Sequence, residues 1–262
     1  MPVTLISWNL KGHSGPDAGA IACELRRLAP DLVVLQEVQW HQARRIARSL
    51  GARSHRWGFK HWPLRTWPEG AAVVGVTRQV RVRTRALSNG WRRWSWRRRI
   101  AQVAAVDGGP AGEPPFTVVN VHLSPHDQAD LRAAETATVL ALAASRPGPV
   151  VIAGDLNERP GGALHRRLAA AGFRDASGVD HDREPPAGSR PPDPVPTNWR
   201  GWQRGTTRPP TQQLDYVYVS PLVAGVELRV PRAGDDDLAR YARLSDHLPV
   251  TAVLTLGSAV GA

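Results

Sequence analysis

The sequence predicts an α/β protein in which mixed β-sheets and helices form one domain. Three observations support this prediction. Short runs of β-forming residues alternate with amphipathic stretches at helical spacing. Other β runs follow one another directly, as in antiparallel hairpins. No internal repeat and no shift in composition marks a second domain within the 262 residues.

The chain begins with two strand and helix units. Residues 3–8 alternate and are rich in β formers, which indicates a strand. Residues 18–28 repeat apolar side chains at helical spacing and stop before Pro30. A compact apolar strand is expected at residues 31–36. A second helix is expected at residues 42–50, where Gly51 closes it.

The middle of the chain predicts mostly antiparallel strands, and the last part mixes strands and helices. The expected middle strands are residues 71–77, 80–86, 100–106 and 116–121. The expected elements after them are a helix at 128–144, a strand at 149–153, a helix at 163–171, and strands at 213–219 and 249–256. Pro and Gly crowd residues 185–210, which indicates a long surface loop.

The charge of the chain is strongly basic. Lys and Arg number 34 against 23 Asp and Glu, which gives a net charge of +11. Only Lys11 and Lys60 are lysines, so nearly all the cations are arginines. Arginine suits a polyanionic partner, because its guanidinium matches phosphate oxygens. A GC-rich genome would also enrich Arg together with Ala, Gly and Pro, so composition alone leaves both interpretations open.

The sequence predicts a cytoplasmic protein. Its N-terminus lacks the basic and apolar regions of a secretory signal, and no apolar run is long enough to span a membrane. The single cysteine, Cys23, cannot form an internal disulfide, which fits a reducing compartment. We also expect a monomer.

Polar residues recur where the expected strands begin or end. The six segments are Ser7-Trp8-Asn9, Leu35-Gln36-Glu37, Asn120-Val121-His122-Leu123, Gly154-Asp155-Leu156-Asn157, Gln213-Leu214-Asp215-Tyr216 and Leu244-Ser245-Asp246-His247. Burying a polar or charged group without a partner costs several kcal/mol. One site shared by all six segments explains the pattern.

In this order, the six segments resemble the endonuclease/exonuclease/phosphatase superfamily, which includes DNase I, exonuclease III-type AP endonucleases, neutral sphingomyelinases, inositol polyphosphate 5-phosphatases and tyrosyl-DNA phosphodiesterase 2. The resemblance runs from Trp8 to Pro249. It implies a DNase I-like four-layer sandwich, with two mixed sheets packed face to face and helices outside. We expect the catalytic domain to span residues 1–256, followed by a short tail at residues 257–262.

The resemblance implies a divalent metal, Mg²⁺ or Mn²⁺, and hydrolysis of a phosphoester by in-line attack of water. Glu37 matches the main metal ligand, Asn9 the amide that joins metal site and phosphate, and Asp246 a second carboxylate near the metal. A hard cation prefers such oxygen ligands.

The resemblance also assigns the catalytic residues. Asp155 would orient or deprotonate the attacking water, and Asn157 would donate to a phosphoryl oxygen. The two are spaced i, i+2, which places them on one face if the chain stays extended. His247 would act on the phosphate as a general base or a cationic donor, with Asp215 orienting it. His122 would protonate the leaving oxygen or bind phosphate.

The sequence departs from the AP endonucleases. Their Tyr is replaced by His122, the Lys soon after their metal-binding Glu is missing after Glu37, and their second Asn is missing after Asn9. The abasic-site specificity of those enzymes is therefore not expected here.

Two segments hint at nucleic acid as the substrate. Residues 53–65 mix cationic and aromatic side chains, and residues 91–99 hold five arginines and three tryptophans. Such mixtures suit a phosphate backbone with stacked bases, although a hairpin with Trp in the core and solvated Arg would show the same pattern. The expected substrate-binding residues are Arg92, Arg93, Trp94, Arg97, Arg132, Asn198 and Trp199.

The sequence predicts a divalent-metal-dependent phosphodiesterase, a nuclease acting on DNA. The alternatives are a phosphatase or sphingomyelinase-like phosphodiesterase acting on a lipid or inositol phosphate, and a non-catalytic nucleic-acid-binding member. The complete set of expected site residues argues against the last.

Overall fold

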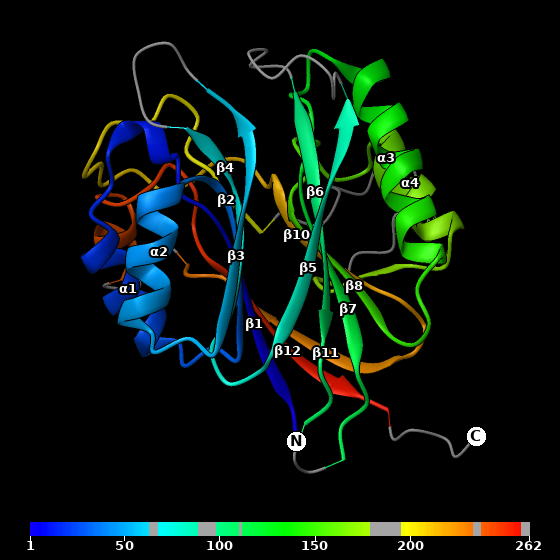
Figure 1. The fold of residues 1–262 in the computed structure, drawn as a ribbon. Helices are drawn as coiled ribbons and strands as arrows, with labels where there is room; N and C mark the ends of the chain where they lie inside the picture. The colour runs from blue at the N-terminus through cyan, green and yellow to red at the C-terminus, as the bar shows by residue number, and fades with distance from the viewer. Residues whose placement is uncertain (63–67, 89–97, 110–111, 179–194, 233–236, 258–262) are drawn as a thin grey trace.

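The computed structural model describes residues 1–62, 68–88, 98–109, 112–178, 195–232 and 237–257. Two six-stranded sheets pack face to face, and helices cover their outer faces (Figure 1). The α/β class and the four-layer DNase I-like sandwich expected from the sequence are therefore confirmed.

The first sheet has the strand order β11-β12-β1-β2-β4-β3. Its strands are β1 (Val3–Asn9), β2 (Leu32–Gln39), β3 (Ser54–His61), β4 (Glu69–Gly75), β11 (Val223–Arg229) and β12 (Val250–Leu256). β1 and β2 are parallel, with Asn9 opposite Gln36 at their carboxyl ends. Both strands therefore deliver polar side chains to one edge of the sheet.

The second sheet has the order β5-β6-β7-β8-β10-β9. Its strands are β5 (Val80–Ser88), β6 (Arg99–Val106), β7 (Phe116–His122), β8 (Val150–Asp155), β9 (Arg174–Asp175) and β10 (Asp215–Val219). β7 and β8 are parallel and end at His122 opposite Asp155. Each sheet thus has a central parallel pair that ends in candidate site residues.

Helices α1 (Ala18–Arg27) and α2 (Trp40–Ser49) cover the first sheet, and α3 (Ala129–Ala144) and α4 (Ala163–Ala170) cover the second (Figure 1). Two short helices, η1 (Gly12–Ser14) and α5 (Asp237–Tyr241), lie between strands in the sequence. Three apolar clusters fill the spaces between the four layers, and the middle cluster joins the facing sides of both sheets. Within the described ranges, no helix has the length and apolar character needed to cross a membrane.

The expected strands and helices are all found, with bounds that differ by a few residues. The sequence analysis missed β3, β9 and β11. The residues of β3 were interpreted only as part of a mixed cationic and aromatic segment, because its two histidines, one arginine and one lysine hide the strand pattern. Part of the predicted surface loop at residues 185–210 is packed inside: Thr197, Asn198 and Trp199 are buried. Residues 185–194 of that loop lie outside the described part of the chain.

Candidate active site

Buried amides connect the two sheets beneath the site. Gln36 Nε2 donates to Asn120 Oδ1 over 2.8 Å, and Asn120 Nδ2 donates to Gln102 Oε1 over 3.1 Å. All three side chains are fully buried, so these hydrogen bonds satisfy groups that water cannot reach. The contacts fix the edge of β2 against β6 and β7.

His247 lies just before β12, and both its side chain and its backbone carbonyl make hydrogen bonds. Its Nδ1 lies 2.8 Å from Asp215 Oδ2, and its carbonyl oxygen accepts a hydrogen bond from Trp8 Nε1 over 2.8 Å. Burial lowers the pKa of His247, but the bonded Asp215 and the nearby Asp155 and Asp246 outweigh it and raise the pKa to about 10. The imidazole is therefore a cation at neutral pH, and Asp215 orients it as expected from the sequence.

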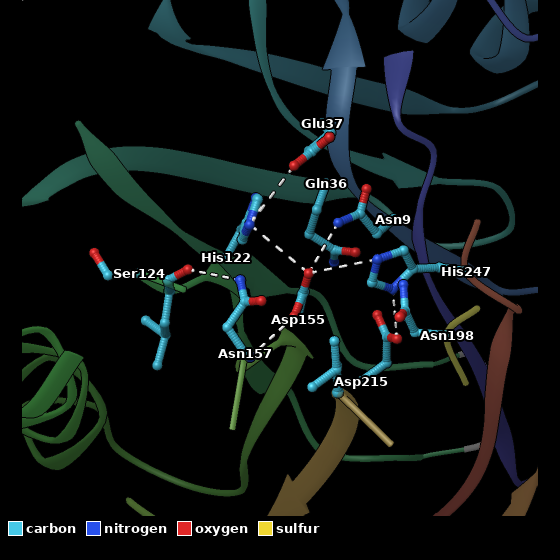
Figure 2. A network of polar contacts seen from close by, with 12 residues as sticks. Asn9, Gln36, Glu37, His122, Ser124, Asp155, Asn157, Asn198, Asp215 and His247 are labelled. Atoms are coloured by element: carbon cyan, nitrogen blue, oxygen red, sulfur yellow. Dashed lines mark hydrogen bonds and ion pairs between the residues drawn. The ribbon is translucent and has the colours of Figure 1, made fainter. Parts of the chain in front are cut away.

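Asp155 ends β8 at the centre of the site, as Figure 2 shows. Its Oδ2 accepts a hydrogen bond from Asn9 Nδ2 over 3.0 Å and lies 3.7 Å from His122 Nε2 and 3.8 Å from His247 Nε2. Burial raises the pKa of this carboxyl to about 7 against the opposing charge of His247. Residues from β1, β7 and the segment just before β12 thus converge on one carboxylate at the end of β8.

Asn157 follows β8 in a turn. Its φ of 51° lies in the left-handed region, and its backbone N–H donates to Asp155 Oδ1 over 2.9 Å. The chain is therefore not extended at Asn157, and the condition under which the i, i+2 spacing would place Asp155 and Asn157 on one face is not met. The turn instead brings the Asn157 amide back to the site, where Nδ2 donates to Leu123 O over 3.0 Å.

Glu37 sits at a bulge in β2, where the pairing with β4 shifts between Leu35 and Val38. Its φ of 47° turns the backbone out of the regular strand. The carboxylate lies 3.7 Å from His122 Nε2 and 3.8 Å from His13 Nδ1. Partial removal from water and the negative charge of Glu69 raise the pKa of Glu37, so this carboxylate favours a nearby cation.

His122 is buried at the end of β7. Among the described residues its Nδ1 has no hydrogen-bond partner, while its Nε2 faces Glu37 and Asp155 (Figure 2). Burial and the charges of Lys60 and Arg99 lower its pKa well below the usual range. The imidazole is therefore neutral at neutral pH.

Asp246 shares its carboxylate between two neighbours. Lys11 Nζ donates to Oδ2 over 2.5 Å, and Oδ1 lies 3.9 Å from His247 Nε2. Oδ1 is buried and has no hydrogen-bond partner within the described ranges. Lys11 also lies over the ring of Trp202, 5.2 Å from its centroid.

A second lysine and carboxylate pair lies near Glu37, because ligand atoms of Glu69 and Glu37 are within 4.8 Å of each other. Lys60 Nζ donates to Glu69 Oε1 over 3.2 Å, and His13 Nδ1 is 3.5 Å from Glu69 Oε2. The sequence analysis did not assign Lys11, His13, Lys60 or Glu69 to the site. The available signal was that the chain has only two lysines and that one of them, Lys11, lies two residues after Asn9.

Three of the expected substrate-binding residues are buried and bonded within the protein. Arg132 is buried on α3, where it contacts Glu158 over 3.3 Å and donates to Pro125 O over 2.7 Å. Asn198 Nδ2 donates to Asp246 O over 3.1 Å, and the Trp199 ring is buried. Their roles toward a substrate stay predictions. Four further expected residues lie outside the described part of the chain: Arg92, Arg93, Trp94 and Arg97.

Residues 53–65 were expected to contact nucleic acid. Several of their side chains instead make contacts within the protein. Lys60 is buried in its ion pair, and Trp57 Nε1 donates to Val38 O over 2.9 Å. His55 and Arg56 are the exposed residues of β3. Residues 63–65 lie outside the described ranges.

The residues present fit a hard divalent cation. Ligand atoms of His13, Glu37 and Glu69 lie within 4.8 Å of one another. Asp246 Oδ1 and Asp215 Oδ1 are buried oxygens without a hydrogen-bond partner among the described residues. Carboxylate and amide oxygens are the ligands that Mg²⁺ and Mn²⁺ prefer.

The sandwich and the polar edge shared by its sheets define a DNase I-like α/β protein. A model of the endonuclease/exonuclease/phosphatase family matches residues 6–247, so the chain belongs to this family. Members of the family are generally phosphoester hydrolases and typically depend on a divalent metal. No curated protein matches the sequence.

Solved structures of similar fold include bacterial and animal proteins. An endonuclease/exonuclease/phosphatase from Beutenbergia cavernae has a TM-score of 0.71 at 23% identity, covering 99% of this chain and 73% of that one. The family member from Bacteroides vulgatus has a TM-score of 0.72 at 17% identity, covering 98% and 100%. Truncated TDP2 of Caenorhabditis elegans has a TM-score of 0.65 at 19% identity, covering 97% and 98%. At these identities the likeness establishes the fold.

Proposed function

We propose that the protein is a divalent-metal-dependent phosphodiesterase that hydrolyses DNA by in-line attack of an activated water. The observation that carries this proposal is the convergence of Asn9, His122 and His247 on Asp155 Oδ2 within 3.0 to 3.8 Å. Such a cluster combines proton transfer with stabilisation of a developing negative charge.

Glu37, Asn9 and Asp246 would hold Mg²⁺ or Mn²⁺ in this proposal. The bound ion supplies a Lewis acid and lowers the pKa of a bound water. The two carboxylates and the amide provide the required oxygen atoms. Asp246 keeps one buried oxygen, Oδ1, without a hydrogen-bond partner in the described chain.

Asp155 would take the proton of the attacking water. Its pKa of about 7, raised by burial, matches the pH at which a general base works best. His247 would place its positive charge against a phosphoryl oxygen, because Asp215 keeps its imidazole protonated and oriented. Asn157 would donate a further hydrogen bond to the phosphate.

His122 would bind the phosphate as a neutral imidazole. Its lowered pKa leaves little of the protonated form that a general acid for the leaving oxygen requires. The structure therefore favours phosphate binding over proton donation, two roles that the sequence left open.

DNA is the proposed substrate because cationic and aromatic groups adjoin the site. A cavity of about 270 Å³ is lined by Trp199, Trp202, Arg200 and Arg208, among other residues. Trp199 connects it to the site, since its backbone N–H donates to Asp246 O over 3.0 Å. Indole rings stack on bases and guanidinium groups bind phosphates. The net charge of +11 favours the same partner.

We further propose that the enzyme acts as a monomer in the cytoplasm. Its single cysteine, Cys23, is exposed and cannot form an internal disulfide, which suits a reducing compartment.

The test is hydrolysis of plasmid DNA and single-stranded oligonucleotides with Mg²⁺ or Mn²⁺, with EDTA and the D155N variant as controls. We expect cleavage by the wild-type protein that EDTA and D155N abolish. Sphingomyelin and a phosphoinositide are assayed in parallel, because a basic surface also attracts anionic membranes. Turnover of either lipid with inert DNA would replace the proposed substrate.

A further inference from the structure

Two tryptophan side chains are exposed in the described part of the chain. Trp40 is 40% exposed and Trp62 is 49% exposed. Every other Phe, Tyr or Trp side chain that the structure describes is buried or half-buried. A single exposed apolar side chain is common on a protein surface and needs no explanation. The positions of these two in the fold therefore decide whether they are related.

Both tryptophans directly follow residues that pair with Glu69. Gln39 at the end of β2 pairs with Glu69 on one side, and His61 at the end of β3 pairs with it on the other. Neighbouring strands are about 4.8 Å apart, so Gln39 and His61 lie about 10 Å from each other. Trp40 and Trp62 continue the chain from these two positions. The two exposed indoles therefore belong to one end of the first sheet.

This end of the sheet is the one that carries the candidate site. Ligand atoms of Glu69, Glu37 and His13 lie within 4.8 Å of one another. The other two exposed large apolar side chains of the described chain, Met1 and Leu222, lie at the opposite end, before β1 and β11. The exposed aromatic residues are therefore gathered at the site and are not scattered over the surface.

A cation lies beside the end of β3. Arg98 Nη1 donates a hydrogen bond to Lys60 O over 3.0 Å, and its guanidinium lies 5.6 Å from the centre of the Phe59 ring. The Arg98 side chain is partly exposed. Guanidinium groups next to aromatic rings suit a strand of nucleic acid, because its phosphates and its bases can be bound together.

We propose that Trp40 and Trp62 form a stacking platform for unpaired bases, so that the preferred substrate of this site is single-stranded DNA. The inference rests on the DNA hydrolysis of the proposed function and specifies the form of the DNA. In a duplex the faces of the bases are stacked on one another, whereas an unpaired base offers its face to an indole ring. Arg98 supplies a positive charge for the backbone of the same strand.

The experiment is fluorescence anisotropy with a labelled single-stranded oligonucleotide and with a blunt duplex of the same sequence, in Mg²⁺ and at one salt concentration. The parent protein and all variants carry D155N, which prevents the expected hydrolysis. We expect the parent to bind the single strand more tightly than the duplex. W40A and W62A are each expected to weaken single-strand binding about 5-fold or more, the scale of one lost base–aromatic stack, and to change duplex binding less than about 2-fold.

Conservative variants and a surface control accompany the two alanine variants. W40F and W62F keep an aromatic face and are expected to retain most of the affinity that the alanine variants lose. The matched control is L222A, which removes a side chain that is 60% exposed at the opposite end of the sheet and is expected to bind as the parent does. Circular dichroism checks that each variant is folded.

Equal or tighter binding of the duplex by the parent would overturn the inference, whether or not any variant folds. A folded W40A or W62A chain that binds the single strand as tightly as the parent, or that weakens single-strand and duplex binding equally, would also overturn it. Binding of phosphatidylserine vesicles that depends on both tryptophans, with single-strand binding unchanged, would assign the platform to a membrane surface instead.

Failure of the proposed function is seen separately, in the chain without D155N. If that chain binds single strands through Trp40 and Trp62 but leaves them intact in Mg²⁺ and Mn²⁺, the proposed hydrolysis is lost and the platform for unpaired bases is retained. If it cleaves DNA without any preference for single strands, the proposed hydrolysis is retained and this inference is lost.

Discussion

At the scale of single residues, burial and neighbouring charges separate the roles of Asp155 and His247. The pKa of Asp155 is raised to about 7 and that of His247 to about 10. One group can accept a proton near neutral pH while the other stays a cation. Two titratable groups whose pKa values are set apart by their surroundings are typical of acid–base sites.

Replacing either group is expected to remove most of the activity. We predict that D155N or H247A lowers kcat at least about 100-fold, the scale of a lost general base or charge-stabilising contact. The measurement is steady-state hydrolysis of an oligonucleotide, with R229A as a surface control expected to behave as wild type. Near-normal turnover in either site variant would remove that residue from its assigned role.

Glu69 is expected to make folding stability depend on acid. Burial raises its pKa, but the His13 hydrogen bond and the Lys60 charge outweigh it and lower the pKa to about 2. A carboxyl with a lowered pKa in the folded state stabilises it above the unfolded value near 4.5 and loses this contribution as the pH falls toward 2. We predict this loss in urea denaturation followed by Trp fluorescence in EDTA.

Lys60 supplies the variant that checks this explanation. K60M leaves Glu69 buried without its lysine, which costs on the order of 3 kcal/mol of unfolding free energy at neutral pH. The dependence of stability on acid between pH 4.5 and 2 is expected to shrink in K60M. A variant with wild-type stability at every pH would show that this ion pair does not stabilise the fold.

The recognised motifs predicted which residues meet at the candidate site better than they predicted the charges around them. The structure brings Asn9, His122, Asp155 and His247 together as expected. Lys11 and Asp246 are 235 residues apart, and neither hydrophobic periodicity nor a local motif reports such a pair. The neutral state of His122 also depends on burial, which only the folded chain defines.

At the scale of elements, the parallel strands position the site. The backbones of β8 and β7 approach each other closely beside Asp155. Gly154 precedes Asp155 and has a φ of 144°; a Cβ there would lie 1.9 Å from Val121 O on β7. Any side chain would push β8 away from β7 directly beside Asp155.

We predict that G154A lowers the unfolding free energy by about 2 kcal/mol or more, because both the backbone conformation and the space exclude a methyl group. The matched control is G225A on β11, where the new Cβ would have ordinary contacts at 3.5 Å. Chemical denaturation of both variants provides the measurement. Equal stabilities would show that β8 relaxes around the added methyl group.

The elements that could be predicted from sequence are those in which buried positions appear as apolar runs. β7 and β8 are buried along their whole length and read as apolar runs. β3 and β11 are edge strands of the first sheet and carry exposed polar residues at many positions. Edge strands need fewer apolar residues, so their sequences lack the signal that marks a central strand. The bulge that turns Glu37 likewise has no distinctive residue type.

At the scale of the whole molecule, positive charge dominates the surface. The edge strand β5 alone exposes Arg81, Arg83 and Arg85 at alternate positions. Side chains at alternate positions of a strand point to one face. The strand therefore carries a row of three arginines, although Arg81 is paired with Asp107 at 2.8 Å.

DNA binding is expected to weaken steeply with salt, because arginines that neutralise phosphates release counterions. We predict a slope of about −3 or steeper for the logarithm of the association constant against that of salt concentration. Fluorescence anisotropy of the D155N variant with a labelled oligonucleotide in Mg²⁺ measures it without cleavage. A flat dependence would show that the arginines are solvated and take no part in binding.

The site belongs to neither sheet alone. Asn9, Glu37 and His247 come with the first sheet, and Asp155, His122 and Asp215 with the second, and their contacts join one sheet to the other. We therefore expect neither sheet, if it were separated from the other, to keep any of the proposed activity. Because the site depends on the alignment of both sheets, we expect the proposed turnover to be lost under mild denaturant before the strands unfold.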